Sequence, residues 1–142
     1  MTINYLAVLV CAIISMIIGS IWYGPLFGKT WMKIMGADSM SAEKKEAMKK
    51  SMGVMYFIQF ILSLITATVL AYFINIAAMS VPMVSGVCIA IIAWFGFGLA
   101  IHAGGALWSG KPKKIACKMF CIAAGAQLIT FIAFGLILGA WR

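Results

Sequence analysis

Residues 51–110 read SMGVMYFIQFILSLITATVLAYFINIAAMSVPMVSGVCIAIIAWFGFGLAIHAGGALWSG and contain no Asp, Glu, Lys or Arg. A water-soluble domain needs a solvated, charged face, so it cannot leave a stretch of this length without charge. The stretch is also too long for one membrane crossing, because a spanning helix needs about 20 apolar residues to cross a hydrocarbon core of about 30 Å. It therefore predicts two membrane-spanning helices in succession.

The rest of the chain has room for two further spans. Of its 142 residues, 65% are hydrophobic and 10% are charged. We expect one all-α integral membrane domain over residues 1–142, a four-transmembrane-helix bundle with spans at about residues 3–23, 52–75, 81–104 and 115–141. The expected break between the second and third spans is Ser80-Val81-Pro82, because proline suits the first turn of a helix and not its interior.

The charged residues indicate how the chain crosses the membrane. They gather in two clusters, at residues 29–50 and 111–118, apart from Arg142 at the end of the chain. Short loops rich in Lys and Arg stay in the cytoplasm. We therefore expect a multi-pass protein of the cell membrane, with cytoplasmic loops at residues 25–50 and 105–114 and both termini outside. This order gives two helical hairpins.

The first basic loop has structure of its own in this interpretation. Residues 26–35 mix apolar side chains with lysines, which is typical of a short helix lying in the membrane interface. The second helix is expected to begin near residue 41, capped by Asp38, Ser39 or Ser41. Its first turns project into the cytosol, where Glu46 and Lys50 form an (i, i+4) pair.

The formal net charge of +8 predicts the partners of the protein. Basic residues near the cytoplasmic surface attract anionic inner-leaflet lipid, by about 1 kcal/mol each. Membrane lipid is therefore the expected partner. Nucleic acid is not expected, because no folded domain outside the membrane presents a reading surface.

Small residues recur every four positions in each span. In lipid, helices associate by close backbone approach and by hydrogen bonds between helices. The candidate helix-packing residues are Gly19, Gly86, Gly98, Gly125, Gly135 and Gly139. These ridges exceed what one small bundle needs, so we also expect a homo-oligomer. A short echo between residues 22–25 (WYGP) and 108–112 (WSGKP) suggests that the two hairpins are parallel repeats.

Four large side chains within the spans are candidates for lining a pore or binding a ligand: Gln59, Trp94, His102 and Gln127. An ionisable residue inside the membrane is a functional candidate, and His102 is the only histidine. The alternative for His102 is a neutral imidazole that bonds a carbonyl, since no carboxylate accompanies it. Gln127 lies near mid-membrane and must find a partner, either on another helix or in a polar cavity.

The sequence lacks the residues that several kinds of membrane transport and catalysis require. No acid lies in any span, which argues against a cation-coupled antiporter with an embedded carboxylate. Walker, HExxH, GxSxG and dinucleotide motifs are absent, so we expect neither an enzyme nor a cofactor. Cys117 and Cys121 are four residues apart, but further metal ligands do not stand near them, so no metal site is expected.

Four stretches of the chain resemble a known family. They are residues 19–32 (GSIWYGPLFGKTWM), 107–112 (LWSGKP), 125–128 (GAQL) and 135–141 (GLILGAW). They resemble the signature of a small bacterial integral membrane family known only as domain of unknown function 1761. The resemblance covers nearly the whole chain. It implies four membrane helices and no known activity.

Three functions are compatible with these observations. The first is a small channel or transporter for a solute or ion, which requires a cavity that meets the candidate lining residues. The second is a non-transporting membrane scaffold or accessory subunit of a larger complex, which predicts a dry bundle whose polar groups bond each other. The third and weakest is an enzyme acting on lipid, which requires that Asp38, Glu43 and Glu46 gather with His102 at the inner surface.

Overall fold

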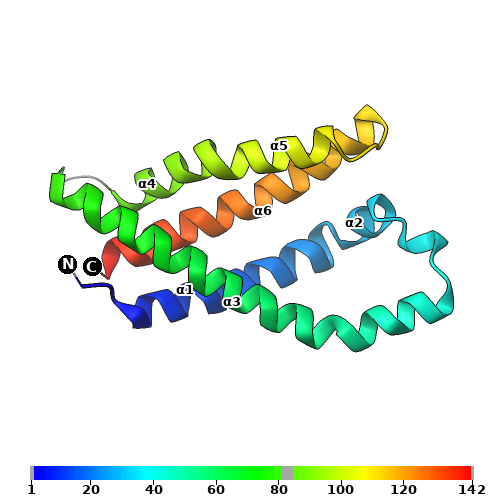
Figure 1. Ribbon diagram of the computed structural model, residues 1–142, viewed down its shortest axis with the longest axis horizontal. Coiled ribbons are helices and arrows are strands. Elements are labelled where there is room, and N and C mark those ends of the chain that lie inside the picture. The colour runs from blue at the N-terminus through cyan, green and yellow to red at the C-terminus, as the bar shows by residue number, and fades with distance from the viewer. Residues whose placement is uncertain (1, 81–84, 142) are drawn as a thin grey trace.

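The structure is a computed structural model that describes residues 2–80 and 85–141, and these residues are almost entirely helical (Figure 1). The helices are α1 (Tyr5–Ile21), α2 (Gly28–Ile34), α3 (Ala42–Ser80), α4 (Gly86–Ala93), α5 (Leu99–Leu107) and α6 (Lys113–Ala140). The π-helical turn η1 (Trp22–Leu26) continues α1, and a second one, η3 (Trp94–Gly98), joins α4 to α5. A short 3-10 turn, η2 (Ala37–Ser39), precedes α3. The all-helical fold class is therefore confirmed.

Four helical segments are long and apolar enough to cross a membrane: Tyr5–Leu26, Ala42–Ser80, Gly86–Leu107 and Lys113–Ala140. They are consistent with a multi-pass membrane protein. The 39 residues of α3 give a length of about 58 Å at about 1.5 Å per residue, nearly twice the thickness of a hydrocarbon core. The expected break at Ser80-Val81-Pro82 lies, apart from Ser80, outside the described residues.

Side-chain caps fix where several of the helices begin. The Asn4 side chain accepts hydrogen bonds from the backbone N–H groups of Leu6 and Ala7, at 3.1 and 3.2 Å. Ser41, one of the three expected caps of the long helix, accepts from the Lys44 N–H at 3.4 Å. A capping oxygen satisfies an amide that has no partner within its own helix.

The exposed start of α3 carries the ion pair that the sequence predicts. Glu46 and Lys50 lie 3.8 Å apart, and both side chains are largely exposed. Exposed pairs of this kind stabilise a helix by about 0.3–0.5 kcal/mol. The prediction of this pair is confirmed, and its contribution to the fold is small.

The helices pack lengthwise into one bundle (Figure 1). α1 contacts both α3 and α6, while α4 and α5 contact α6. The described ends of the chain lie at the same end of the bundle, together with the end of α3 and the start of α4. We call this the terminal end and the opposite one, which holds α2 and the turn between α5 and α6, the loop end.

The tightest core lies toward the terminal end. It consists mainly of small residues that allow helices to approach closely, with a few large side chains between them. Its buried members are Ala7, Val8, Cys11, Ala67, Leu70, Ala71, Ile74, Ala90, Phe134 and Leu138. Small residues at helix contacts are what lipid-embedded helices require, because association there depends on van der Waals packing.

Glycines bring α4 and α6 into backbone contact. A Cβ added to Gly135 would lie 2.7 Å from Val87 Cα and 2.8 Å from the carbonyl oxygen of Gly86. A Cβ added to Gly86 would lie 2.8 Å from Gly139 Cα. The structure thus places three of the candidate packing glycines at one helix crossing, where no side chain fits.

The π turn η3 keeps one face of the third span directed inward. Residues four apart precess by about 40° per step on an ideal α-helix. In η3 the Leu99 N–H bonds the carbonyl of Trp94, five residues earlier, so the turn holds an extra residue. The extra residue offsets much of this accumulated rotation and so keeps the ridge on one face of the span. The six residues of this ridge are all buried or half-buried: Gly86, Ala90, Trp94, Gly98, His102 and Ala106.

The structure does not support the sequence echo between residues 22–25 and 108–112. Trp22 opens a π turn and is half-buried, whereas Trp108 follows the end of α5 and is 91% exposed. The local counterpart of Trp22-Tyr23-Gly24 is Trp94-Phe95-Gly96, which opens the second π turn. The Trp, Gly and Pro that the two segments share were too few to identify which positions are structurally equivalent.

We predict that Gly135→Ala destabilises the bundle by about 1–3 kcal/mol, because the new methyl group meets backbone atoms that cannot move aside. The matched control is Gly105→Ala, where an added Cβ meets nothing within 4 Å. The free energy of unfolding in detergent measures both. Equal stability of the two variants would contradict the close crossing of α4 and α6.

Candidate functional site

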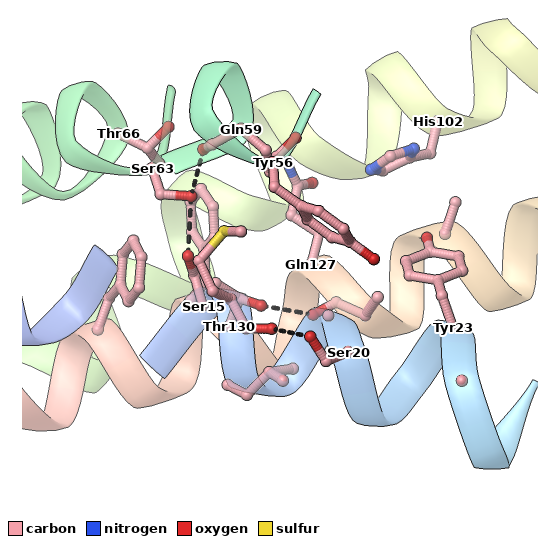
Figure 2. Close-up of a pocket in the computed structure, with 18 residues that line it drawn as sticks. Ser15, Ser20, Tyr23, Tyr56, Gln59, Ser63, Thr66, His102, Gln127 and Thr130 are labelled. Carbon is pink, nitrogen blue, oxygen red and sulfur yellow. Dashed lines mark hydrogen bonds between the residues drawn. The ribbon is translucent and has the colours of Figure 1, made fainter. Parts of the chain in front are cut away.

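A cavity of about 520 Å³ lies between α1, α3, α5 and α6 (Figure 2). Polar side chains gather along it: Ser15, Ser20, Tyr23, Tyr56, Gln59, Ser63, Thr66, His102, Gln127 and Thr130. Figure 2 shows Tyr23 and His102 at one end of this group and Ser15 and Ser63 at the other. The cavity therefore offers hydrogen-bonding groups along its length, inside segments apolar enough to cross a membrane.

α3 contributes one regular stripe to the cavity wall. Tyr56, Gln59, Ser63 and Thr66 follow one another at spacings of three, four and three residues. Residues at these spacings lie on the same face of a helix. Elsewhere in this part of α3 the side chains are large and apolar, such as Phe57, Ile58 and Leu62, and they are exposed to the surroundings of the bundle. The wall is thus the polar face of a helix whose other faces suit lipid.

The cavity ends at a hydrogen bond between α1 and α3. The hydroxyl oxygens of Ser15 and Ser63 lie 2.8 Å apart, and Ser63 is buried. Phe134, which is 1% exposed, also lines the cavity here and belongs to the core. This contact marks the boundary between the packed terminal end and the hollow part of the bundle.

Gln127 on α6 holds a side-chain oxygen that has no protein partner. Its Oε1 atom is buried and makes no hydrogen bond with any described residue. The carboxamide lies against Gly98, so closely that a Cβ at that position would collide with Oε1. The same Cβ would lie 2.9 Å from Cδ1 of Trp94. Gly98 therefore makes the space in which the Gln127 side chain rests.

Both π turns direct an indole to the backbone of α6. Trp22 Nε1 donates to the carbonyl of Ile122 at 2.9 Å, and Trp94 Nε1 donates to the carbonyl of Ala124 at 3.2 Å. Residues two apart lie about 200° apart around a helix, so the two indoles approach α6 from opposite sides. Gly125 lies against Trp22, since an added Cβ would be 3.0 Å from the indole ring. The two tryptophans hold α6, and with it Gln127, in place.

The structure brings together three of the four residues proposed as lining candidates. Gln59, His102 and Gln127 line the one cavity, each from a different helix. Trp94 does not line it and instead contacts α6 beside Gln127. Gly19, proposed for helix packing, lines the cavity, and an added Cβ there meets nothing within 4 Å.

The described residues do not form the cluster of acidic residues with His102 that an enzyme acting on lipid would require. Asp38, Glu43 and Glu46 are exposed, and none of them lines the cavity with His102. A hollow near the start of α6 is lined by Lys113, Lys114, Cys117, Lys118 and Cys121. The nearby Lys111 donates from Nζ to the carbonyl of Ile34 at 2.8 Å, so it joins the second basic loop to the end of α2.

Sequence reasoning missed the tyrosines and hydroxyl residues of the cavity. Aromatic residues such as Tyr23 and Tyr56 are common at membrane boundaries, so their presence near the end of a span does not indicate a cavity. Ser63 and Thr66 read as ordinary small or polar members of a span. The signal that could have found them is the stripe on α3, where Tyr56 and Thr66 extend the Gln59–Ser63 spacing in both directions.

A comparison with known protein families matches residues 6–139 to the family described as "Protein of unknown function (DUF1761)". The match covers nearly the whole chain and confirms the resemblance drawn from its Trp, Gly and Pro motifs. No curated protein and no solved structure matches the chain. The description of this family states no activity.

We predict that Gly98→Ala destabilises the protein by about 1–3 kcal/mol, because the methyl group displaces the Gln127 carboxamide. In a Gln127→Ala background the same change should cost at least about 0.5 kcal/mol less, as expected for residues in direct contact. A double-mutant cycle on the free energy of unfolding in detergent measures this coupling. Gly104→Ala on α5, where the added Cβ has open space, is the control. An additive cycle would contradict the contact.

Proposed function

The chain belongs to the DUF1761 family, and because that family's description assigns no function, we propose one from the cavity. We propose that the protein is a small membrane transporter and that its solute occupies the cavity between α1, α3, α5 and α6. The observation that carries this proposal is the convergence of Gln59, His102 and Gln127 on one cavity. Its volume falls within the range of about 300–1,000 Å³ that is common for small-molecule sites.

The scaffold hypothesis makes a different prediction about the polar groups. In a dry bundle they would bond one another, as Ser15 and Ser63 do. Gln127 Oε1 departs from that pattern, because it is buried without a partner among the described residues. A polar atom left unpaired in a membrane costs several kcal/mol, so we propose that the Gln127 carboxamide turns toward water or a solute in the cavity.

The two ends of the bundle favour a carrier over an open pore. The terminal end is filled by the small-residue core and by the glycine crossing of α4 and α6. We propose that this end faces outward and the two basic loops face the cytoplasm, as the lysine distribution predicts. The solute would then reach the cavity from the cytoplasmic half, and passage would require the terminal end to open.

The basic surface suggests how the protein sits in its membrane. We propose that Lys113, Lys114 and Lys118, which line the hollow on α6, contact anionic inner-leaflet lipid. We also propose a homo-oligomer, because the spans carry more small-residue ridges than one small bundle needs. Both proposals concern the surroundings of the cavity and leave its chemistry unchanged.

Filling the cavity tests the transport function. Gly19→Phe places a ring in the space that Gly19 leaves open, and should abolish solute flux into proteoliposomes above the rate of empty vesicles. Gly105→Phe is the control, because Gly105 is exposed and its added Cβ also meets open space. Stopped-flow light scattering after osmotic shock, with glycerol and urea as probes, measures the flux. A wild-type rate equal to that of empty vesicles would instead support the scaffold.

Cysteine labelling tests the orientation. In a variant whose four native cysteines are replaced by serine, Lys45→Cys should react with a membrane-impermeant maleimide only in inside-out vesicles. Lys45 is exposed at the start of α3, so accessibility does not limit the reaction. Labelling of intact cells from the external medium would reverse the proposed topology.

A further inference from the structure

The cavity wall carries no fixed charge. No Asp, Glu, Lys or Arg is among its lining residues, and its titratable members are His102 from α5, Tyr23 from η1 and Tyr56 from α3. An ion that entered this half-open site would lose part of its hydration without gaining a fixed partner of opposite charge, which is costly inside a membrane. The wall therefore suits an uncharged solute.

The hydroxyl groups of the wall present acceptors rather than donors. Ser63 donates to the carbonyl of Gln59 at 2.9 Å, and Thr66 donates to the carbonyl of Leu62 at 2.9 Å. Thr130 on α6 does the same with the carbonyl of Ala126, at 2.9 Å. A hydroxyl has one hydrogen and two lone pairs. Since the hydrogen is already engaged with the helix backbone, the hydroxyl can offer a solute only its lone pairs and so can only accept.

Serines on α1 repeat the same pattern. Ser20 donates to the carbonyl of Met16 at 2.8 Å, and Ser15 lies 2.8 Å from both the Ala12 carbonyl and the Ser63 hydroxyl oxygen. Whichever partner Ser15 chooses, its hydrogen is engaged. Gln127 Oε1 is a buried acceptor that rests against Gly98, without a hydrogen-bond partner among the described residues. The hydroxyls of the wall are thus acceptors that can take hydrogen bonds from a solute.

Donors also line the cavity. Figure 2 shows Tyr23 and His102 at the end away from Ser15 and Ser63. A phenol hydroxyl and an imidazole N–H can each donate one hydrogen bond, and the carboxamides of Gln59 and Gln127 each carry an NH2 group with two hydrogens. The site therefore offers hydroxyl acceptors together with donors from several helices.

We propose that the solute is an uncharged molecule that carries several N–H or O–H donors together with an acceptor, as in ureas, carboxamides and small polyols. This inference rests on the proposed transport function and names its substrate class. The donors of the solute would face the hydroxyls of Ser63, Thr66 and Thr130. Its acceptor would face the tyrosines, His102 or a carboxamide NH2 group.

Three probes of similar size test the two requirements separately in proteoliposomes. Urea has both donors and an acceptor, guanidinium keeps the planar donor set but is charged, and trimethylamine N-oxide is an acceptor without donors. Urea should cross several-fold faster than in protein-free vesicles, because the cavity offers hydrogen-bond partners that the lipid core lacks. Guanidinium and trimethylamine N-oxide should cross at the protein-free rate.

A matched pair of variants connects the effect to the wall. Thr66 and Thr68 both donate to the carbonyl four residues earlier on α3, but only Thr66 lines the cavity. Thr66→Val removes one acceptor and should slow urea flux by about three- to tenfold. Thr68→Val should leave the flux unchanged.

The outcomes separate this inference from the function on which it rests. If guanidinium or trimethylamine N-oxide crosses as fast as urea, transport stands and the proposed substrate class is wrong. Equal urea flux in the Thr66→Val and Thr68→Val variants would also overturn the class. If no probe crosses faster than in empty vesicles, the transport function itself fails and the inference fails with it.

Discussion

The structure depends on the close crossing of α4 and α6 at Gly86, Gly135 and Gly139, where backbone meets backbone. Hydrophobic burial gives membrane helices little reason to associate, so contact at this short range supplies the packing energy that holds the second half of the chain together. The crossing lies toward the terminal end, next to the small-residue core. Because the helices meet closely at this end, the cavity lies in the other part of the bundle.

The polar residues of this space are of two kinds: those that hydrogen-bond within their own helix, and those that need a partner elsewhere. Serine and threonine hydroxyls satisfy themselves on carbonyls of their own helices, as Thr66 does with Leu62, and so tolerate either lipid or a cavity. A glutamine carboxamide has no such route, and Gln127 is left with a buried oxygen that needs a donor. The indoles of Trp22 and Trp94 fix α6 from both sides and so hold that oxygen in a defined position.

The sequence predicts the membrane class because lipid leaves a charge-free chain few alternatives to spanning helices. It also predicts Gln59, His102 and Gln127 as a group, because large polar side chains stand out among apolar residues. It cannot predict that Trp94 points to α6 rather than to the cavity, since that depends on a π turn with no strong local signal. Nor can it predict that Ser63 and Thr66 line the cavity, because a hydroxyl in a span bonds its own helix whichever way it faces.

The extra residue within η3 also bears on how this chain can change over evolutionary time. Each residue turns an α-helix by about 100°, so losing one position between Trp94 and Gly98 would rotate everything that follows relative to α4. His102 would then point away from Gln59 and Gln127, although every amino acid of the cavity would still be present. Substitutions near the π turn are therefore easier to accommodate than a single-residue deletion, and relatives that keep this site should keep the length of this segment.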